Sequence, residues 1–272
     1  MRTDPRPTAD AIGAYYPDDY GPYMTAPVIK VKPSTWHRRF KARWNRWLGK
    51  DVRRIPDIAP GRMLEVGSAG GAYLLEMQAK GWTVEGIEFS PAAAQKARER
   101  GLNVRTGSLE TATPPQEKAD VIAAWMVLEH LHEPLAGLRK MHEWVRPDGY
   151  LVAAVPDASA LERRVFGEYW YGWHLPAHLY HYTPDSLRRL LDKAGWTLCA
   201  MHWQPNPMNL LNSLEWQAEA HGRQRLLRLA RWLKHSPKAG KLRRWLGWLL
   251  GITRQSGRME FWARPKPQPR TA

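Results

Sequence analysis

Short apolar runs alternate with amphipathic stretches through the middle of the chain. The runs predict strands, and the stretches between them predict helices. The predicted strands are 63–66, 83–88, 103–105, 120–125 and 150–155, with a last pair at 196–203 and 258–263. The predicted helices are 72–79, 91–100, 134–144 and 184–194. This alternation predicts a doubly wound, mostly parallel seven-stranded α/β sheet, which binds its ligands at the carboxyl ends of the strands.

Local signals set several of these boundaries. Ser90-Pro91 and Thr183-Pro184 each combine a capping hydroxyl with a proline at the first helical position. Gly195 follows the last helix as a stop signal, and the segment 147–149 (Pro-Asp-Gly) predicts a turn before the fifth strand.

A glycine-rich loop follows the first strand, and an acidic residue precedes it. The sequence Glu65-Val66-Gly67-Ser68-Ala69-Gly70-Gly71 lacks the G-x-G-x-x-G spacing of a dinucleotide site and the lysine of a P-loop. Glu88 ends the second strand, where an acid in such folds accepts hydrogen bonds from ribose hydroxyls. Two strand-end acids around a glycine loop favour a nucleoside ligand that carries no phosphates.

These motifs resemble those of the class I S-adenosylmethionine-dependent methyltransferases over about residues 58–204 and 258–263. Val127-Leu128-Glu129-His130 is similar to a motif of the ubiquinone-methyltransferase-like branch, and 174–182 is similar to a subgroup often encoded among cell-surface polysaccharide genes. Tyr15 to Tyr20 fits the same subgroup. The resemblance implies a Rossmann-like methyltransferase fold with S-adenosylmethionine as cofactor. It implies cofactor contacts from Glu65, Gly67, Ser68, Gly71, Glu88, Phe89, Leu109 and Trp125.

Two positions depart from the family pattern. Ala69 stands where a second glycine is usual, and we expect it to fit with a negative φ. Ser108 stands where the family often has an aspartate that contacts the adenine, so a weaker contact from the serine or one from the backbone N–H of Leu109 is the expected substitute.

Histidines near the predicted carboxyl edge are candidates for removing a proton from a hydroxyl acceptor. An unperturbed histidine is mostly neutral near pH 7, which suits a general base. The candidates are His178, His181 and His130, with His178 favoured, and the aromatic residues of 169–182 could line an acceptor pocket. The alternative is that these aromatics cover the sheet edge and the histidines only bond backbone carbonyls. No histidine spacing indicates a metal, and none is expected.

Charge is concentrated in the two flanks. The formal net charge is +15, yet residues 60–204 hold 15 Lys/Arg against 17 Asp/Glu. The flanks contain three basic stretches rich in tryptophan or leucine, at 35–50, 225–235 and 241–250. Such amphipathic helices lie in a membrane interface, and anionic lipids attract them. Plain packing or a dimer contact is the alternative, and nucleic acid is disfavoured because no recognised binding motif is present.

Composition limits the other classes of protein. The single cysteine, Cys199, excludes an internal disulfide, and no apolar run approaches the ~20 residues that span a bilayer. We therefore expect a cytoplasmic protein, with peripheral contact at the inner membrane face. The expected divisions are an N-terminal extension (1–57), a cofactor-binding core (58–204), a basic helical insertion (205–257), the last core strand (258–264) and a disordered tail (265–272).

Together these patterns predict a methyltransferase that methylates an oxygen of a sugar, a lipid-linked glycan intermediate or another lipophilic small molecule. The competing interpretation is a non-catalytic basic adaptor that uses a degenerate fold of this type to bind membrane or nucleic acid. A nicotinamide dehydrogenase is disfavoured by the loop spacing.

Overall fold

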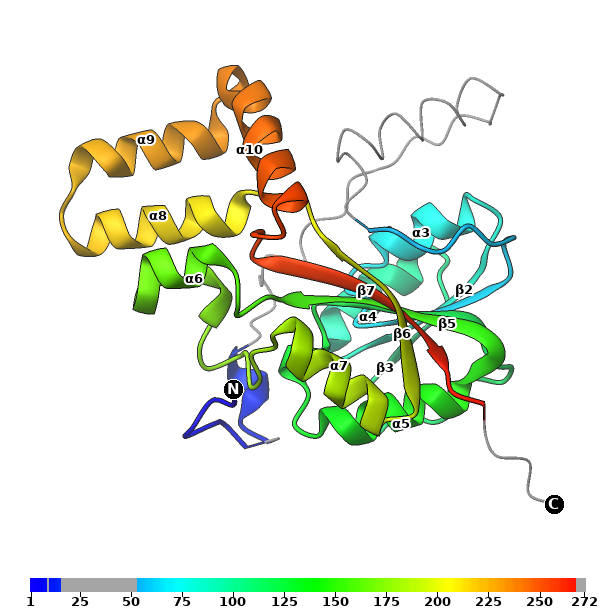
Figure 1. Ribbon diagram of the computed structural model, residues 1–272. Helices are drawn as coiled ribbons and strands as arrows, with labels where there is room; N and C mark the ends of the chain where they lie inside the picture. The colour runs from blue at the N-terminus through cyan, green and yellow to red at the C-terminus, as the bar shows by residue number, and fades with distance from the viewer. Residues whose placement is uncertain (9, 16–52, 268–272) are drawn as a thin grey trace.

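The computed structural model describes residues 1–8, 10–15 and 53–267. The predicted helix at 35–50, Tyr16 to Tyr20 and the last five residues of the tail lie outside the described residues. A seven-stranded sheet, in the order β3-β2-β1-β4-β5-β7-β6, forms the centre of the molecule (Figure 1). Its strands are β1 (Arg62–Val66), β2 (Thr83–Glu88), β3 (Val104–Thr106), β4 (Ala119–Trp125), β5 (Val145–Pro156), β6 (Trp196–Trp203) and β7 (Arg258–Pro265).

The first five strands are parallel, and β7 runs antiparallel between β5 and β6. The predicted doubly wound, mostly parallel sheet is therefore confirmed. The strand order reverses direction between β1 and β4, and at such a switch point the carboxyl ends leave room for a ligand.

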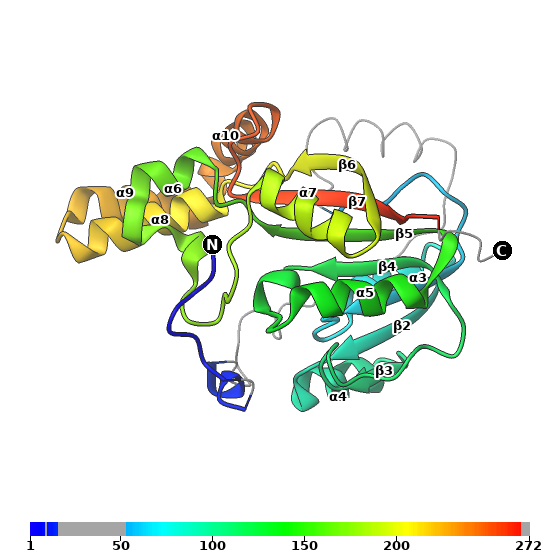
Figure 2. The ribbon, with the colours of Figure 1, turned by 60° about the horizontal axis from the view of Figure 1, so that its bottom comes forward.

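Helices cover both faces of the sheet (Figure 2). The core helices are α3 (Ala72–Gln78), α4 (Pro91–Glu99), α5 (Pro134–Trp144) and α7 (Pro184–Lys193). Because side chains alternate along a strand, Leu64 of β1 packs in a cluster with residues of α5 and α7, whereas its neighbour Met63 packs with residues of α3. The sheet thus has an apolar layer on each face.

Several local predictions needed correction. The last strand, β7, ends at Pro265, so the first residue of the predicted disordered tail (265–272) belongs to the sheet. The third strand begins one residue later than expected, at Val104. The predicted turn at 147–149 is assigned within β5, but the pairing with β4 passes from Ala119↔Val145 to Val121↔Tyr150. Four residues of β5 therefore lie opposite one residue of β4. The Pro-Asp-Gly sequence forms an irregularity inside the strand rather than a turn before it.

The helix ends follow the capping signals in the sequence. Ser90 accepts a hydrogen bond from the Ala93 N–H at 3.2 Å, and Thr183 and Ser186 form a reciprocal capping box at the start of α7. Gly195, at φ 87°, ends that helix. Both caps satisfy N–H groups that a helix end otherwise leaves unpaired.

A helical layer extends beyond the carboxyl end of β5. It contains α6 (Leu161–Phe166), α8 (Met208–Ala220), α9 (Gln224–His235) and α10 (Gly240–Ile252), with short 3-10 turns η3 (Gly167–Tyr169), η4 (Tyr171–Trp173) and η5 (Pro237–Ala239). Figures 1 and 2 both show α8 beside α9, with α6 against α8. Two more 3-10 turns, η1 (Ile12–Tyr15) and η2 (Leu128–His130), lie near the sheet's carboxyl edge.

Candidate functional site

The loop between β1 and α3 is closely packed around its glycines. Gly67 and Gly71 have φ values of 73° and 78°, in the left-handed region that favours glycine. A Cβ atom at Gly67 would lie 2.7 Å from Val127, and one at Gly71 would lie 2.3 Å from Leu102. The loop therefore touches the segment after β4 and requires glycine at both positions.

Ala69 adopts φ 46°, so the expectation of a negative φ at this position is wrong. The reason is a hydrogen bond across the loop: the Ala69 N–H donates to Glu88 Oε2 at 2.7 Å. This bond holds the alanine in a left-handed conformation that costs an L-residue about 1–2 kcal/mol.

Glu88 joins the glycine loop to the start of α4. Its Oε1 accepts from the Ser90 N–H at 2.8 Å, while its Oε2 accepts from Ala69. Burial raises the pKa of this carboxyl, and the backbone N–H donors oppose that shift. Phe89 follows with an exposed ring, and a Cβ at Gly13 of η1 would lie 3.9 Å from it. The N-terminal turn thus reaches the predicted cofactor site.

Four buried polar atoms around the loop have no hydrogen-bond partner among the described residues. They are Glu65 Oε2, Ser68 Oγ, Tyr73 Oη and Trp125 Nε1. Buried polar groups are normally paired, so a cluster of unpaired ones marks a place for a ligand or water. Tyr73 was not among the sequence candidates, although its position just after the loop was a signal; its ring meets that of Trp125 edge to face at 5.4 Å.

Glu65 is a strongly perturbed acid at this edge. Burial raises its pKa to about 8, Arg53 lowers it, and Glu88 raises it further. Arg53 lies over the Tyr73 ring, 4.8 Å from its centroid, so a cation already stands near the acid. An acid, a hydroxyl pair and an indole N–H suit a ligand with a cationic amino group and several hydroxyls.

The segment at Ser108 and Leu109, which is expected to contact the adenine, makes contacts within the protein. Ser108 Oγ lies 3.2 Å from Thr111 Oγ1, and the Leu109 side chain is buried in the core. Any contact from Leu109 to a ligand would therefore come from its backbone.

His130 and His178 face each other at the end of β4 with their ring centroids 4.7 Å apart. The Nδ1 of His130 lies 3.0 Å from the Ala177 carbonyl oxygen, and the Nδ1 of His178 lies 2.9 Å from that of Gly172. A carbonyl only accepts, so each Nδ1 carries the proton and the neutral ring has its lone pair on Nε2. One nitrogen of each ring therefore bonds a backbone carbonyl, as the alternative interpretation of these histidines expected.

Burial lowers the pKa of His130 to about 4 and that of His178 well below its ordinary value. Glu129 adds a fully buried carboxyl with no hydrogen-bond partner among the described residues, and burial raises its pKa to about 8. Ligand atoms of Glu129, His130 and His178 lie within 4.8 Å of one another, close enough to hold a metal ion. Sequence spacing did not reveal this group, because His178 comes from a distant segment.

His181 is held by the N-terminal residues. The Thr3 hydroxyl donates to the His178 carbonyl at 2.6 Å, so the His181 Nε2–H donates to Thr3 Oγ1 at 3.2 Å. Its Nδ1 is buried without a partner among the described residues, and burial lowers the pKa of the ring to about 4. Thr3 is a contact that the sequence could not predict.

The aromatic residues of 169–182 divide between core and edge. Trp170 is fully buried and donates its indole N–H to Glu162 at 3.3 Å. Trp173 meets His181 edge to face at 4.8 Å. Of these two tryptophans, only Trp173 lies against a candidate histidine.

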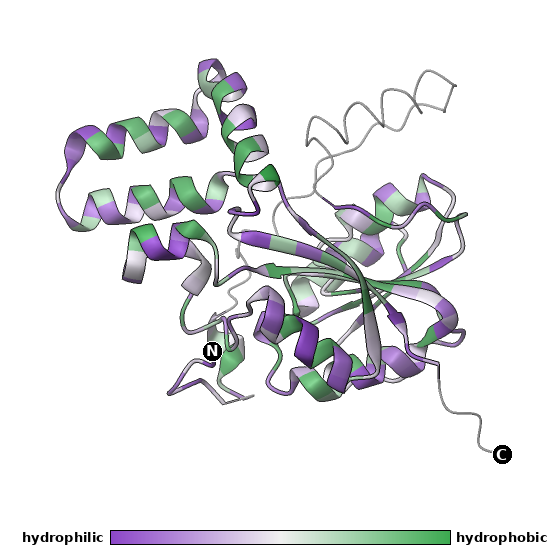
Figure 3. Ribbon diagram, in the orientation of Figure 1, coloured by the Kyte–Doolittle hydropathy of each residue, from purple (hydrophilic) through white to green (hydrophobic). Residues whose placement is uncertain are grey.

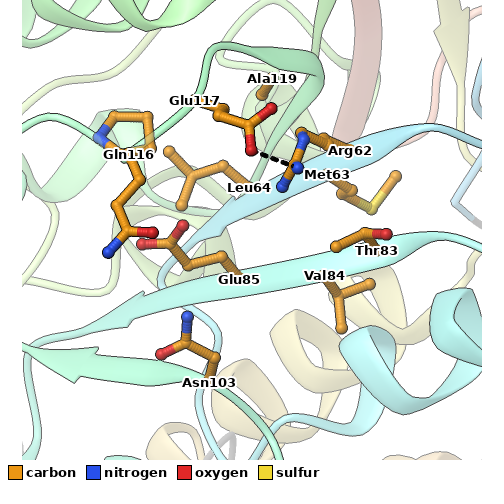
Figure 4. A pocket seen from close by; sticks show the side chains of 11 residues that line it. Arg62, Met63, Leu64, Thr83, Val84, Glu85, Asn103, Gln116, Glu117 and Ala119 are labelled. Atoms are coloured by element: carbon orange, nitrogen blue, oxygen red, sulfur yellow. Dashed lines mark hydrogen bonds and ion pairs between the residues drawn. The ribbon is translucent and has the colours of Figure 1, made fainter.

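Two cavities lie at the opposite, amino edge of the sheet. One of about 100 Å³ is lined by the first residues of β1, β2 and β4 and bordered by the Arg62–Glu117 ion pair (Figure 4). Another, of about 490 Å³, includes Lys118 and Val145. Neither is lined by residues of the glycine loop or by His130, His178 or His181, so neither changes the location of the candidate site.

A family model described as "Methyltransferase domain" matches residues 36–200. The ubiquinone biosynthesis O-methyltransferase of Cereibacter sphaeroides (strain ATCC 17025 / ATH 2.4.3) is 29% identical over 146 residues, which are 49% of this chain and 59% of that protein. The enzyme of the same name from Azorhizobium caulinodans is 27% identical over 204 residues, 70% of this chain and 78% of that protein. The match thus spans less than two thirds of the first of these relatives.

Solved structures share the fold. The cyclase SpnF covers 97% of this chain and 98% of its own, with a TM-score of 0.57 and 17% identity. An S-adenosylmethionine-dependent methyltransferase from Mesorhizobium loti covers 77% of this chain and 93% of its own, with a TM-score of 0.50 and 14% identity. At these identities the likeness shows the fold alone.

Proposed function

The chain belongs to the class I S-adenosylmethionine-dependent methyltransferase family, and from that premise we propose that it transfers a methyl group to an oxygen of a small lipophilic or sugar-bearing acceptor. The observation that carries the proposal is the set of four unpartnered polar atoms around the glycine loop, led by Glu65 Oε2. They supply the acidic and hydroxyl contacts that this cofactor requires.

Each cofactor residue has a separate part in this proposal. Glu65 meets the amino group of the cofactor, and Glu88 accepts from ribose hydroxyls through the lone pairs that Ala69 and Ser90 leave open. Gly67 and Gly71 allow the backbone to approach, and Ser68 offers its hydroxyl. Phe89 and the Leu109 backbone flank the adenine, while Trp125 closes the site from β4.

The bound cofactor supplies a methyl group on a positively charged sulfur, so the protein mainly aligns the acceptor and removes its proton. His178 takes that proton on Nε2, because the Gly172 carbonyl fixes its tautomer. Its lowered pKa keeps the ring neutral, and therefore able to accept a proton, through the neutral pH range. His130 and His181 orient the acceptor hydroxyl whose proton His178 removes.

The acceptor class rests on two arguments. The curated relatives are named as O-methyltransferases of ubiquinone biosynthesis, which favours oxygen as the acceptor atom. The unpartnered Glu129 carboxyl beside His178 offers a hydrogen-bond site for an acceptor hydroxyl. The acceptor that we propose is a sugar, a lipid-linked glycan intermediate or a hydroxylated lipophilic ring, presented at the cytoplasmic membrane face. The fold alone does not fix the reaction, since one structural neighbour is named a cyclase.

The test is methyl transfer from labelled S-adenosylmethionine to three kinds of hydroxyl acceptor: a nucleotide sugar, a lipid-linked sugar and a hydroxylated aromatic. We expect His178→Asn to lower kcat by about 10²–10⁴-fold and to leave the Kd for S-adenosylhomocysteine within twofold. His221→Asn, at the exposed histidine that caps the C-terminus of α8, is the matched control and should keep wild-type turnover.

The pH profile adds a second readout. Because the pKa of His178 is lowered, kcat should stay flat from pH 6 to 8 and fall only in more acidic buffer. A rate that rises steeply through pH 6.5, or full turnover in His178→Asn, would exclude this histidine as the base.

A further inference from the structure

Helices α9 and α10 carry the same pattern of side chains on their surfaces. In each helix the order along the chain is a basic residue, leucine, any residue, arginine, a large apolar residue, any two residues and tryptophan. The members are Arg225, Leu226, Arg228, Leu229 and Trp232 in α9, and Lys241, Leu242, Arg244, Trp245 and Trp248 in α10. All ten side chains are exposed. We call these ten residues the paired basic–aromatic surface.

The packing of the two helices does not use this surface. Leu227 and Ala230 are the buried residues of α9, and Gly247 and Leu250 are those of α10. A Cβ at Gly247 would lie 2.4 Å from the Pro205 carbonyl oxygen, so α10 lies tightly against the segment after β6. The contact side of each helix is therefore fixed, and the paired surface faces outward.

Exposed tryptophans are unusual enough to need an explanation. Trp245 is 56% exposed and Trp232 is 46% exposed, and exposed apolar patches commonly mark interaction sites. Figure 3 shows hydrophobic and hydrophilic positions interleaved along both helices. Because these rings stay in water, the fold does not gain the free energy that burying their apolar surface would contribute.

The charge around these rings has one sign. No Asp or Glu occurs from His221 to Met259, a stretch with 11 Lys/Arg. Arg231 and Lys234 pair with Glu215 of α8, so the basic residues on the inner side serve the fold. In the part of the chain that the structure describes, the four basic residues of the paired surface make no ion pair.

We propose that the paired basic–aromatic surface docks the protein on a membrane containing anionic phospholipids. The tryptophans and leucines enter the headgroup boundary, where indole rings are favoured, and the Lys/Arg side chains pair with lipid phosphates. The described residues include no helix long and apolar enough to cross a bilayer. The inference goes beyond methyl transfer and does not depend on it.

The composition of the surface favours a membrane over other partners. The core of a protein interface is depleted of charges, whereas here every large apolar residue has a Lys or Arg beside it or one turn away. Single-stranded nucleic acid could stack on the tryptophans, but it has no use for the exposed Leu226, Leu229, Leu242 and Ile252. Aliphatic and aromatic side chains among basic ones match a headgroup boundary best.

The test uses the full chain and vesicles of phosphatidylcholine, alone or mixed with phosphatidylglycerol. We expect co-sedimentation and a blue shift of tryptophan fluorescence with the mixed vesicles, both weakened by salt, and little binding to phosphatidylcholine. The R225Q/R228Q/K241Q/R244Q variant should bind the mixed vesicles at least tenfold more weakly, because each basic residue near the surface contributes about fivefold.

A matched control keeps the test specific. R139Q/R188Q removes charges from exposed positions of α5 and α7 and should bind as the wild type does. W245S/W248S should keep its circular dichroism and show a smaller blue shift, to which Trp232 alone of the paired surface still contributes. Equal binding of all variants, no binding to anionic vesicles, or a preference for a single-stranded oligonucleotide over them would overturn the proposal. So would a dimer in vesicle-free buffer that W245S/W248S converts to a monomer.

Discussion

Glu65 couples ligand binding to protonation. Its pKa of about 8 leaves it mostly protonated at pH 7, whereas a cationic amino group prefers the carboxylate. Binding of S-adenosylhomocysteine should therefore release a proton, and its affinity should rise as pH increases from 6 to 8, by up to about tenfold per pH unit. Calorimetry in buffers of different ionisation enthalpy measures this proton release. Glu65→Gln should abolish it; a wild-type affinity independent of pH would contradict the role given to Glu65.

Glu129 gives a stability signature. Burial raises its pKa from 4.5 to about 8, so the folded state holds a proton that the unfolded state loses between these pH values. That contribution to the free energy of unfolding is present below pH 4.5 and is lost as pH rises towards 8. Urea titrations measure the free energy of unfolding of Glu129→Gln and of the wild type at pH 5 and at pH 7.5. From the lower to the higher pH, the free energy of unfolding of the variant should gain about 1–3 kcal/mol relative to that of the wild type. Glu99→Gln, at an exposed position of α4, is the control, and an unchanged difference between the two pH values would refute the assignment.

Among the elements, the glycine loop stores backbone strain at Ala69. A glycine there adopts φ 46° without steric cost, although it loses more entropy on folding. Ala69→Gly should therefore raise the free energy of unfolding by roughly 0.5–1 kcal/mol in guanidinium titrations. Ala92→Gly, in α4, should lower it by a similar amount, and a loss of stability in both variants would contradict the strain.

Elements formed by local patterns were predictable, and long-range contacts were not. Strand β2 and helix α5 have the predicted bounds because an apolar run and a proline at the first turn specify them locally. Ala69 was mispredicted because its φ depends on a hydrogen bond to Glu88, 19 residues away. The Thr3–His181 bond joins residues 178 positions apart, and the proton positions on His178 depend on where the Gly172 carbonyl lies.

In the whole molecule, the acids and histidines occupy the carboxyl edge of one sheet, and the basic surface lies on helices beyond it (Figure 1). This division predicts that the two functions separate. Removing the charges of the four basic residues of the paired surface should weaken binding to anionic vesicles at least tenfold and leave S-adenosylhomocysteine affinity unchanged. Parallel loss of both would show instead that the variant disturbs the fold.

Titration of the full chain with S-adenosylhomocysteine in a calorimeter tests the proposed cofactor site, on which the methyltransferase proposal rests. The account predicts one site per chain with micromolar Kd, weakened at least tenfold by Glu88→Ala, with circular dichroism of the variant as the check on folding. A folded wild-type protein that takes up neither S-adenosylhomocysteine nor S-adenosylmethionine would contradict it.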